Sequence, residues 1–437
     1  MDIFLPTSLE EGKRYYKDFS GFDVIFISGD PYFDHPLSGT ALLARLLDQK
    51  GYKVGIVSEP ETDHEFLSCG APKFFFCITS GLLDSMLANY TPILKKRENI
   101  LVPERALIAY TQKIKQLFKG KMTVIGGVEA TIRRFTHFDY KENKLRRGIL
   151  NDTKADLLVF GNADRTLLTL LSRLKKLDSA EFDRIKERLE LSTIDGLAYR
   201  IRENEMQNIR ELPSYESCVE DKNKFNLLTL THYLLPDDAF IERCGVGIIR
   251  HNRMSHPLAE EEMDYVYSVP FTRRLHPKGK QYSLNQGMLD GFENSVVIGR
   301  GCWGSCNFCI IPLVQGKNIA KRSINSITKE IELLYRKGTK KINDLTLPTI
   351  NMYGSYCNLY DQEETIFSPI IGKDVKVYNK TEYCDQNCVG CKHRVLRDDL
   401  YELLVEVEKL NKQYNSELEV RSAIRHDVIL SQKKLFE

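Results

Sequence analysis

The chain has 437 residues, enough for about two to three domains with a sizeable buried core. Its 62 lysines and arginines nearly balance 60 aspartates and glutamates, which argues against a nucleic-acid coat protein, a nucleic-acid partner and an acidic tail protein. No apolar run approaches the ~18 residues of a membrane span. Because residues 1–19 also lack an apolar signal core, the sequence predicts a cytoplasmic protein without a membrane partner.

Short apolar runs alternate with helical patterns in the first third of the chain. A helix is predicted over 39–50, where leucines share one face and Gly51 follows. The apolar runs have the length of strands and cover 23–28, 53–57, 74–78, 123–127 and 156–160. Continuous apolar strands separated by helices predict a buried parallel sheet covered on both faces, and ligands of such sheets lie beyond the carboxyl ends of the strands.

The sequence predicts three parts, which are a domain at 1–191, a connecting region at 192–286 and a second β/α series at 287–437. The connecting region reads as loop-rich, with a strand at 197–201 and a short helix at 260–266. In the second series we expect strands at 294–298, 341–345 and 418–422 and helices at 326–337, 399–412 and from 427 onward.

Seven of the 11 cysteines lie between Cys302 and Cys391. Clustered thiols in a long chain without a secretion signal favour metal or redox chemistry over a disulfide scaffold. Cys302, Cys306 and Cys309 fall within eight residues, so one loop can hold three thiolates around one corner of a metal cluster. A structural zinc site would be closed by four ligands, whereas a four-iron cluster held by three cysteines leaves one iron open. The spacing therefore favours an iron–sulfur cluster over a zinc site or incidental buried thiols.

A second thiol group lies in a segment that shows no regular periodicity, residues 355–395. Cys384, Cys388 and Cys391 repeat the spacing of the first group, and Cys357 precedes them. Four thiolates would close a zinc site or hold a second iron–sulfur cluster, so a metal is favoured over free thiols, and the residues do not decide between zinc and iron. A metal would compensate for the poor hydrophobic core of this segment.

The three-cysteine motif, with an aromatic residue before its last cysteine, resembles that of the radical S-adenosylmethionine (SAM) superfamily. Further motifs along nearly the whole chain resemble the YgiQ-type radical SAM family. They include Gly29-Asp-Pro-Tyr-Phe-Asp-His-Pro36, Gly126-Gly-Val-Glu-Ala130, Arg133-Arg-Phe-Thr-His-Phe-Asp-Tyr140 and Pro348-Thr-Ile-Asn-Met-Tyr-Gly354.

This resemblance implies an α/β protein with an N-terminal flavodoxin-like domain, similar to cobalamin-binding domains, followed by a partial radical SAM (β/α) barrel. It implies that Cys302, Cys306 and Cys309 hold a [4Fe–4S] cluster and that Phe308 lies near the SAM adenine. An electron from a flavodoxin- or ferredoxin-type donor would cleave SAM to a 5′-deoxyadenosyl radical, which abstracts hydrogen from a substrate that the sequence does not identify. The family also carries a similar four-cysteine insertion at 355–395.

The second series contains fewer β/α units than a radical SAM barrel usually has. We therefore expect a barrel truncated at its C-terminal end, with a partner chain that supplies the remaining strands. Two interpretations stay open. The first is a radical SAM enzyme, and the second is a catalytically inactive or split-chain metal- or ligand-binding scaffold of the same lineage.

Two further groups have competing interpretations. His35 follows the first strand, but the spacing expected of a cobalt-ligating histidine is absent, so a hydrogen-bonding role is favoured. Four arginines, Arg133, Arg134, Arg146 and Arg147, would either bind an anionic substrate or form an ion-paired face, and the ion-paired face is favoured.

Overall fold

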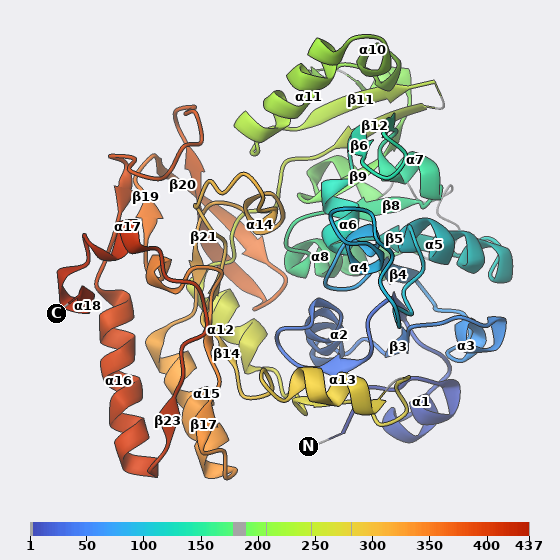
Figure 1. The fold of residues 1–437 in the computed structure, drawn as a ribbon. Coiled ribbons are helices and arrows are strands. Elements are labelled where there is room, and N and C mark those ends of the chain that lie inside the picture. The colour runs from blue at the N-terminus through green and yellow to red at the C-terminus, as the bar shows by residue number, and fades with distance from the viewer. Residues whose placement is uncertain (1–2, 178–188, 207, 246, 281, 437) are drawn as a thin grey trace.

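The computed structural model describes residues 3–177, 189–206, 208–245, 247–280 and 282–436. Five parallel strands form one end of a nine-stranded sheet, in the order β3-β1-β4-β5-β8 from its edge inward (Figure 1). This order, in which the second strand lies outside the first, is that of flavodoxin-like sheets. The five strands fall on the five predicted apolar runs, so this part of the prediction is confirmed. They are β1 (Val24–Ser28), β3 (Val54–Ser58), β4 (Phe75–Thr79), β5 (Met122–Ile125) and β8 (Leu157–Val159).

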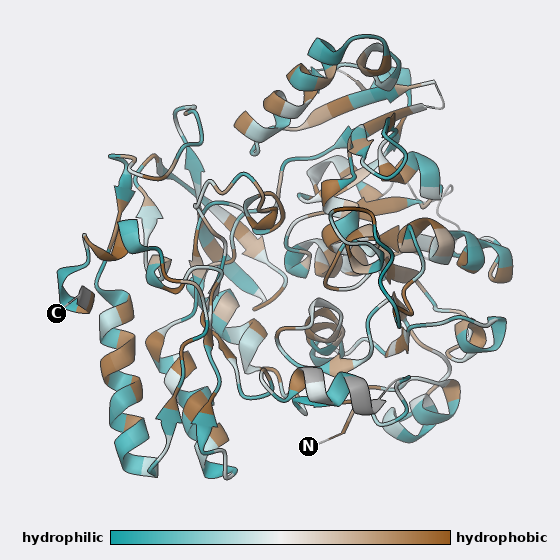
Figure 2. Cartoon of the chain, viewed as in Figure 1, coloured by the Kyte–Doolittle hydropathy of each residue, from teal (hydrophilic) through white to brown (hydrophobic). Residues whose placement is uncertain are grey.

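The apolar runs are continuous because both faces of the parallel strands are buried. Along β1, Val24 and Phe26 join one hydrophobic core with the leucines of α2 (Gly39–Gln49), while Ile25 joins the core on the other face with α5 (Ala106–Leu117). Figure 2 shows the same distribution, with hydrophobic residues concentrated in the central strands. The helix predicted at 39–50 is therefore α2.

The sheet is mixed rather than purely parallel, which corrects the prediction of a loop-rich region at 192–286. Four strands of this region extend the sheet beyond β8, with β9 and β12 running antiparallel to their neighbours. They are β9 (Leu197–Ile201), β12 (Gly247–His251), β11 (Phe240–Cys244) and β10 (Arg210–Glu211). Of these, only β9 was predicted. In β11 the buried carboxylate of Glu242 interrupts the apolar pattern by which a strand is recognised.

The second β/α series contains four short strands in two parallel pairs, which lie on or beside the three predicted runs. β14 (Val296–Val297) pairs with β18 (Leu345–Thr346), and β17 (Lys341–Ile342) pairs with β23 (Glu417–Leu418). The helices α15 (Ile324–Arg336) and α16 (Asp399–Tyr414) pack against each other and share one hydrophobic core with these strands. The domain boundaries themselves stay a prediction.

The cysteine-rich insertion is a long β-hairpin, although its sequence shows no periodicity at first sight. β20 (Tyr360–Ser368) pairs antiparallel with β21 (Lys373–Lys380), and β19 (Tyr356–Cys357) pairs with β22 (Arg394–Val395). The hairpin turn carries Ile370, which packs into the same core as α2. The insertion therefore has a partial hydrophobic anchor of its own.

The remaining elements connect these parts. The helices are α1 (Leu9–Tyr15), α3 (Asp63–Leu67), α4 (Ser85–Asn89), α6 (Gly127–Ile132), α7 (Ile149–Thr153), α8 (Asp164–Leu174), α10 (Tyr215–Glu220), α11 (Lys222–Leu234), α12 (Glu260–Ser268), α13 (Tyr282–Leu289), α14 (Ile311–Gln315), α17 (His426–Ile429) and α18 (Lys433–Phe436). The other strands are β2 (Phe33–Asp34), β6 (His137–Asp139), β7 (Lys144–Arg146), β13 (Arg274–Leu275), β15 (Gly299–Arg300) and β16 (Ala320–Lys321). Within the described part of the chain, none of the helices combines the length and apolar character needed to cross a bilayer.

A buried ion pair holds the loop after β1 against α2. Arg45 Nε and Nη2 donate to Asp34 Oδ1 and Oδ2 at 2.9 and 2.5 Å, and both side chains are buried. Removing one partner would leave the other charge buried and unpaired, which costs about 3–5 kcal/mol. We therefore expect Arg45→Met to lower the free energy of unfolding by about 3–5 kcal/mol in urea titrations of the purified chain.

The matched control is Arg14→Met, which breaks the exposed pair between Arg14 and Glu10. We expect it to change stability little, because exposed ion pairs are screened by water. A loss for Arg45→Met no greater than that for Arg14→Met would contradict the assignment of the Asp34 pair as a structural anchor.

Candidate cluster and cofactor site

The loop that carries the first cysteine group starts from an anchored arginine. Arg300 Nη1 and Nη2 donate to Asp164 Oδ2 and Oδ1 at 2.7 and 3.1 Å, and Arg300 Nε donates to Tyr267 Oη at 2.8 Å. Burial alone would lower the pKa of Arg300, but the Asp164 carboxylate and Tyr267 outweigh burial and raise it. Asp164 begins α8, which follows the last parallel strand. The pair therefore ties the cysteine loop to the carboxyl end of the sheet.

The structure places the three cysteines at different depths. Cys302 is only 8% exposed, and its Sγ lies 3.8 Å from both Thr349 Oγ1 and Met352 Sδ. Cys306 is exposed, while Cys309 is half-buried, and its backbone N–H donates to the carbonyl of Cys306 at 3.0 Å. The loop thus buries its first thiol and opens toward solvent at the other two.

A cation that the sequence analysis missed lies beside these thiols. Arg425 Nη1 is 3.7 Å from Cys306 Sγ, and the guanidinium is oriented by Asp427. A Cβ at Gly304 would lie 3.4 Å from both Arg425 Nη1 and Cys302 Sγ, so this glycine leaves space beside the cation and the buried thiol. The pKa of Arg425 is raised, first by Asp427 and then by the two thiols. A neighbouring cation favours the thiolate form that binds metal.

The segment that follows the three-cysteine motif forms hydrogen bonds with the start of the cysteine loop. Cys302 N–H donates to the carbonyl of Gly316 at 3.1 Å, and Gly301 N–H donates to Gln315 Oε1 at 3.0 Å. Gly301 has φ +95°, and a Cβ there would lie 2.3 Å from the carbonyl oxygen of Asn318. Only glycine fits this position.

Phe308, expected near an adenine, is 90% exposed. At this exposure its ring is accessible to a planar ligand.

The donor set fits a thiolate-bound iron–sulfur cluster in its chemistry. Three thiols share one glycine-containing loop, and a cation lies beside two of them. All 11 cysteines are free thiols, and among the described residues no three histidine, cysteine or carboxylate side chains already converge on one point. Binding a cluster therefore requires the exposed part of the loop to fold in toward Cys302.

Two cysteines of the insertion, Cys357 and Cys388, lie beside Arg394. Arg394 Nη2 is 3.1 Å from Cys388 Sγ, and Cys357 is the residue opposite Arg394 in the pairing of β19 with β22. The N–H of Cys391 donates to the carbonyl of Cys388 at 3.3 Å, and Lys380 Nζ lies 3.6 Å from Cys384 Sγ. The structure thus places Cys357 on a strand paired with the one that carries Arg394, while the four thiols do not yet converge on one point among the described residues.

Trp303 connects the two thiol groups. It follows Cys302 in sequence, is buried, and donates from Nε1 to Ser355 Oγ at 2.8 Å. The guanidinium carbon of Arg394 lies 5.5 Å from the centre of its ring. Since Trp303 is the single tryptophan of the chain, its fluorescence reports on both groups.

A cavity of about 490 Å³ lies between the two halves of the protein, which are the part that contains the nine-stranded sheet and the second β/α series. It lies beyond the carboxyl ends of the parallel strands. Its walls are mostly apolar and come from α2, from the glycine-containing loops after β4, β5 and β8, and from the second series. Arg300 and Ile311, which flank the three-cysteine loop on either side, both line it. Burial raises the pKa of Asp30, at the edge of this cavity, to about 6. The position matches the usual ligand site of such sheets.

His35 is a structural residue. It is buried, its Nδ1 accepts from the N–H of Leu37 at 3.0 Å, and its Nε2 hydrogen-bonds to the carbonyl of Glu293 at 3.1 Å. Burial lowers its pKa well below the usual value. Both ring nitrogens are engaged, so the hydrogen-bonding interpretation is confirmed.

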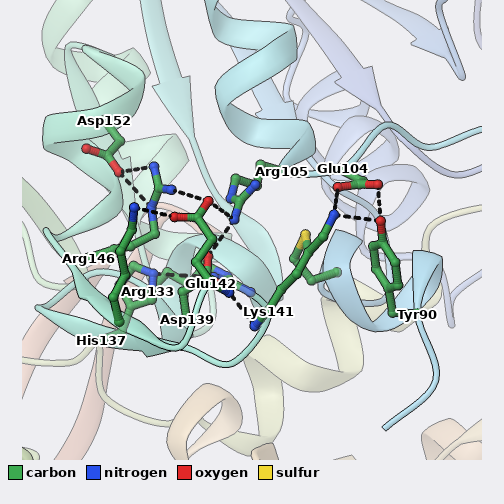
Figure 3. Close-up of polar contacts among 12 residues, drawn as sticks. Tyr90, Glu104, Arg105, Arg133, His137, Asp139, Lys141, Glu142, Arg146 and Asp152 are labelled. Carbon is green, nitrogen blue, oxygen red and sulfur yellow. Dashed lines mark hydrogen bonds and ion pairs between the residues drawn. The ribbon is translucent and has the colours of Figure 1, made fainter. Parts of the chain in front are cut away.

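Three of the four arginines singled out from the sequence belong to an ion-paired network. Arg133 Nε donates to Asp84 at 2.6 Å, while Arg146 and Arg147 both donate to Asp152, with nitrogen–oxygen distances of 3.0 and 2.9 Å. Figure 3 shows Arg146 between Asp152 and Glu142, and Arg133 beside His137. The ion-paired interpretation is confirmed for these three, whereas Arg134 stands apart from them.

Comparison with known proteins finds relatives over the whole chain. A family model described as Radical SAM N-terminal matches residues 4–286. A UPF0313 protein of Fusobacterium nucleatum is 35% identical over 457 aligned residues, which cover 99% of this chain and 74% of that protein. A UPF0313 protein of Methanocaldococcus jannaschii is 38% identical, with 81% of this chain and 59% of that protein covered. Among solved structures, the radical SAM methyltransferase TsrM of Kitasatospora setae, with cobalamin and a [4Fe-4S] cluster bound, matches with a TM-score of 0.43 and 14% identity, over 75% of this chain and 48% of that one.

The geometry at Gly301 predicts a local effect on the cysteine loop. Gly301→Ala would force a Cβ into the carbonyl of Asn318, at a strain cost of about 1–3 kcal/mol. Because the loop must then move, we expect the fluorescence emission of Trp303 to shift to longer wavelength as its ring becomes more exposed.

Gly120→Ala serves as the control, since Gly120 also has a positive φ, of +76°, but a Cβ there would meet nothing within 4 Å. Equal emission spectra for the two variants would show that crowding at Asn318 does not hold the loop.

Proposed function

Because the chain belongs to the UPF0313 family of YgiQ-type radical SAM proteins, we propose that it is a radical SAM enzyme whose cluster ligands are Cys302, Cys306 and Cys309. One observation carries the proposal. The residues on both sides of the three-cysteine loop line the cavity at the carboxyl end of the flavodoxin-like sheet. A radical formed at this loop would therefore meet a substrate in a chamber shared by both halves of the protein.

The bound [4Fe–4S] cluster would supply one electron, received from a flavodoxin- or ferredoxin-type donor, to break the C5′–S bond of SAM into methionine and a 5′-deoxyadenosyl radical. The residues of this chain prepare that chemistry. Arg425 places a positive charge beside Cys306, and the exposed ring of Phe308 is available to stack on the adenine. The apolar walls of the cavity exclude water and so limit side reactions of a reactive intermediate.

The second interpretation is a catalytically inactive or split-chain scaffold of the same lineage. The short strands of the second series and the open arrangement of Cys306 and Cys309 favour it. The chain spans about three quarters of the length of its Fusobacterium nucleatum relative. A partner chain that completes the barrel stays a prediction, and cleavage of SAM separates the two interpretations.

The insertion supports a second metal, either zinc or an iron–sulfur cluster. Cys357 and Cys388 are buried, and Arg394 and Lys380 place positive charge beside Cys388 and Cys384. Four thiolates with adjacent cations satisfy the ligand count of a closed structural site. Such a site would fix the end of the hairpin, where the hydrophobic core is thin.

The proposed function predicts iron binding and SAM cleavage that depend on the three-cysteine loop. After anaerobic reconstitution we expect about four iron per chain in excess of any metal on the insertion, and formation of 5′-deoxyadenosine from SAM under a strong reductant. Cys306→Ala should lose both, because it removes one of three ligands. Iron analysis and chromatography of the products measure the two quantities.

Cys218→Ala is the matched control, since Cys218 is buried among apolar side chains far from the loop in a separate core. It should retain iron and SAM cleavage. Iron without any 5′-deoxyadenosine would support the scaffold interpretation, and the absence of iron from the wild-type chain would overturn both the cluster and the enzyme.

The proposed second site predicts metal binding by the insertion alone. A variant with Cys302, Cys306 and Cys309 all changed to alanine should still bind metal, about one zinc or a second iron–sulfur cluster per chain. Adding Cys388→Ala to this variant should abolish the binding. Metal analysis by mass spectrometry identifies the element, and a metal-free triple variant would contradict the second site.

A further inference from the structure

A small cavity of about 60 Å³ lies on the other side of the cysteine loop. Three parts of the chain meet there. Arg134 follows α6 and His232 belongs to α11, residues 312–318 follow the three-cysteine motif, and Tyr360 and Lys380 belong to the insertion hairpin. Neither the proposed cluster nor the large cavity uses this space.

Arg134 is a buried cation without a counter-ion. It is 8% exposed, and its Nη1 donates to the carbonyl of Thr131 at 2.7 Å, while its Nε has no hydrogen-bond partner. No carboxylate pairs with it among the described residues, in contrast to its neighbour Arg133. The guanidinium carbon lies 4.6 and 4.9 Å from the ring centres of Phe135 and Phe160. Burial lowers the pKa of Arg134 to about 10, so the side chain is still charged at neutral pH.

The other walls of the cavity carry two lysines and two histidines, and burial lowers the pKa of His232 to about 3 and that of His256 to about 4. Lys317 Nζ donates to Tyr233 Oη at 3.1 Å and to the carbonyl of Gln386 at 2.5 Å, both of which are neutral. His232 Nδ1 and His256 Nε2 are buried without a partner. One carboxylate is found among the described lining residues, that of Asp237, which accepts from Tyr360 Oη at 3.1 Å. With Arg134, Lys317 and Lys380 against Asp237, the cavity has an excess of positive charge.

A buried, unpaired cation costs several kcal/mol, so a site of this kind is stabilised by an anion. The volume corresponds to about four to six water positions, which admits a small anion and excludes a nucleoside. Arginine binds phosphate and carboxylate oxygens with two parallel hydrogen bonds. Since the donors here come from several sides, they match the four oxygens of a tetrahedral ion better than the two of a planar carboxylate.

We propose that this cavity binds a tetrahedral oxyanion, either free inorganic phosphate or the phosphate group of a larger ligand, through Arg134, Lys317 and His256. The sequence left open whether the four arginines bind an anion or form ion pairs. Under this proposal Arg134 binds an anion, while the other three form ion pairs. It does not depend on the iron–sulfur cluster and is tested without it.

Anion binding has a consequence for the cysteine loop. Lys317 belongs to the segment that closes this loop, where the carbonyl of Gly316 accepts from Cys302 N–H. The carbonyl of Lys317 accepts from Arg394 Nη2 at 3.2 Å, and Arg394 lies over the ring of Trp303. An anion that holds Lys317 therefore also holds the surroundings of Trp303.

The test titrates the purified full-length chain with inorganic phosphate and follows Trp303 fluorescence and the heat of binding. We expect saturable binding of one phosphate per chain. Arg134→Met and Lys317→Met should each weaken it about tenfold or more, because each removes a charged hydrogen-bond donor. Arg147→Met is the control, since Arg147 is paired with Asp152 outside the cavity, and it should bind phosphate as the wild type does.

The proposal is overturned if phosphate does not saturate, or if Lys317→Met, which changes a half-buried residue and leaves the core intact, binds phosphate as tightly as the control. Competition identifies the source of the anion. If glycerol phosphate displaces inorganic phosphate, the site takes the phosphate group of a larger ligand, and if it does not, the site takes the free ion, and either result supports the oxyanion. Acetate binding as tightly as phosphate would overturn the tetrahedral assignment.

Discussion

The buried pair between Arg300 and Asp164 determines how the two halves of this protein meet. Arg300 lies two residues before Cys302, and Asp164 begins the helix that follows the last parallel strand. Both charges are buried, so each depends on the other, and loss of one partner would cost about 3–5 kcal/mol. This one contact places the start of the cysteine loop at the carboxyl end of the sheet, and the position of the large cavity follows from it.

Around this anchor the second half forms two joined thiol groups. Trp303 links the loop of Cys302 to Arg394, which lies beside Cys388 of the insertion. The segment that closes the loop also lines the small cavity of Arg134. The proposed cluster, the proposed second metal and the proposed anion site therefore share one wall, and a change in any of them would be felt at Trp303.

The sequence predicted those parts of the molecule that depend on residues close together in the chain, namely the parallel strands and the cysteine loop. The five apolar runs gave the parallel strands, and the spacing of Cys302, Cys306 and Cys309 identified the loop. The sequence did not predict the strand at Phe240–Cys244, because the buried Glu242 interrupts its apolar pattern. Arg425 beside Cys306 and the unpaired state of Arg134 depend on contacts between distant segments, for which neither spacing nor composition gives a signal.

The central claim is that three cysteines hold a four-iron cluster whose fourth iron is open to SAM. Electron paramagnetic resonance of the anaerobically reconstituted and reduced protein, recorded with and without SAM, tests it most directly. Binding of SAM to an open iron predicts a clear change in the g-values of the reduced cluster, and this change should disappear in Cys306→Ala. A cluster signal that SAM leaves unaltered in the wild-type protein would contradict the claim.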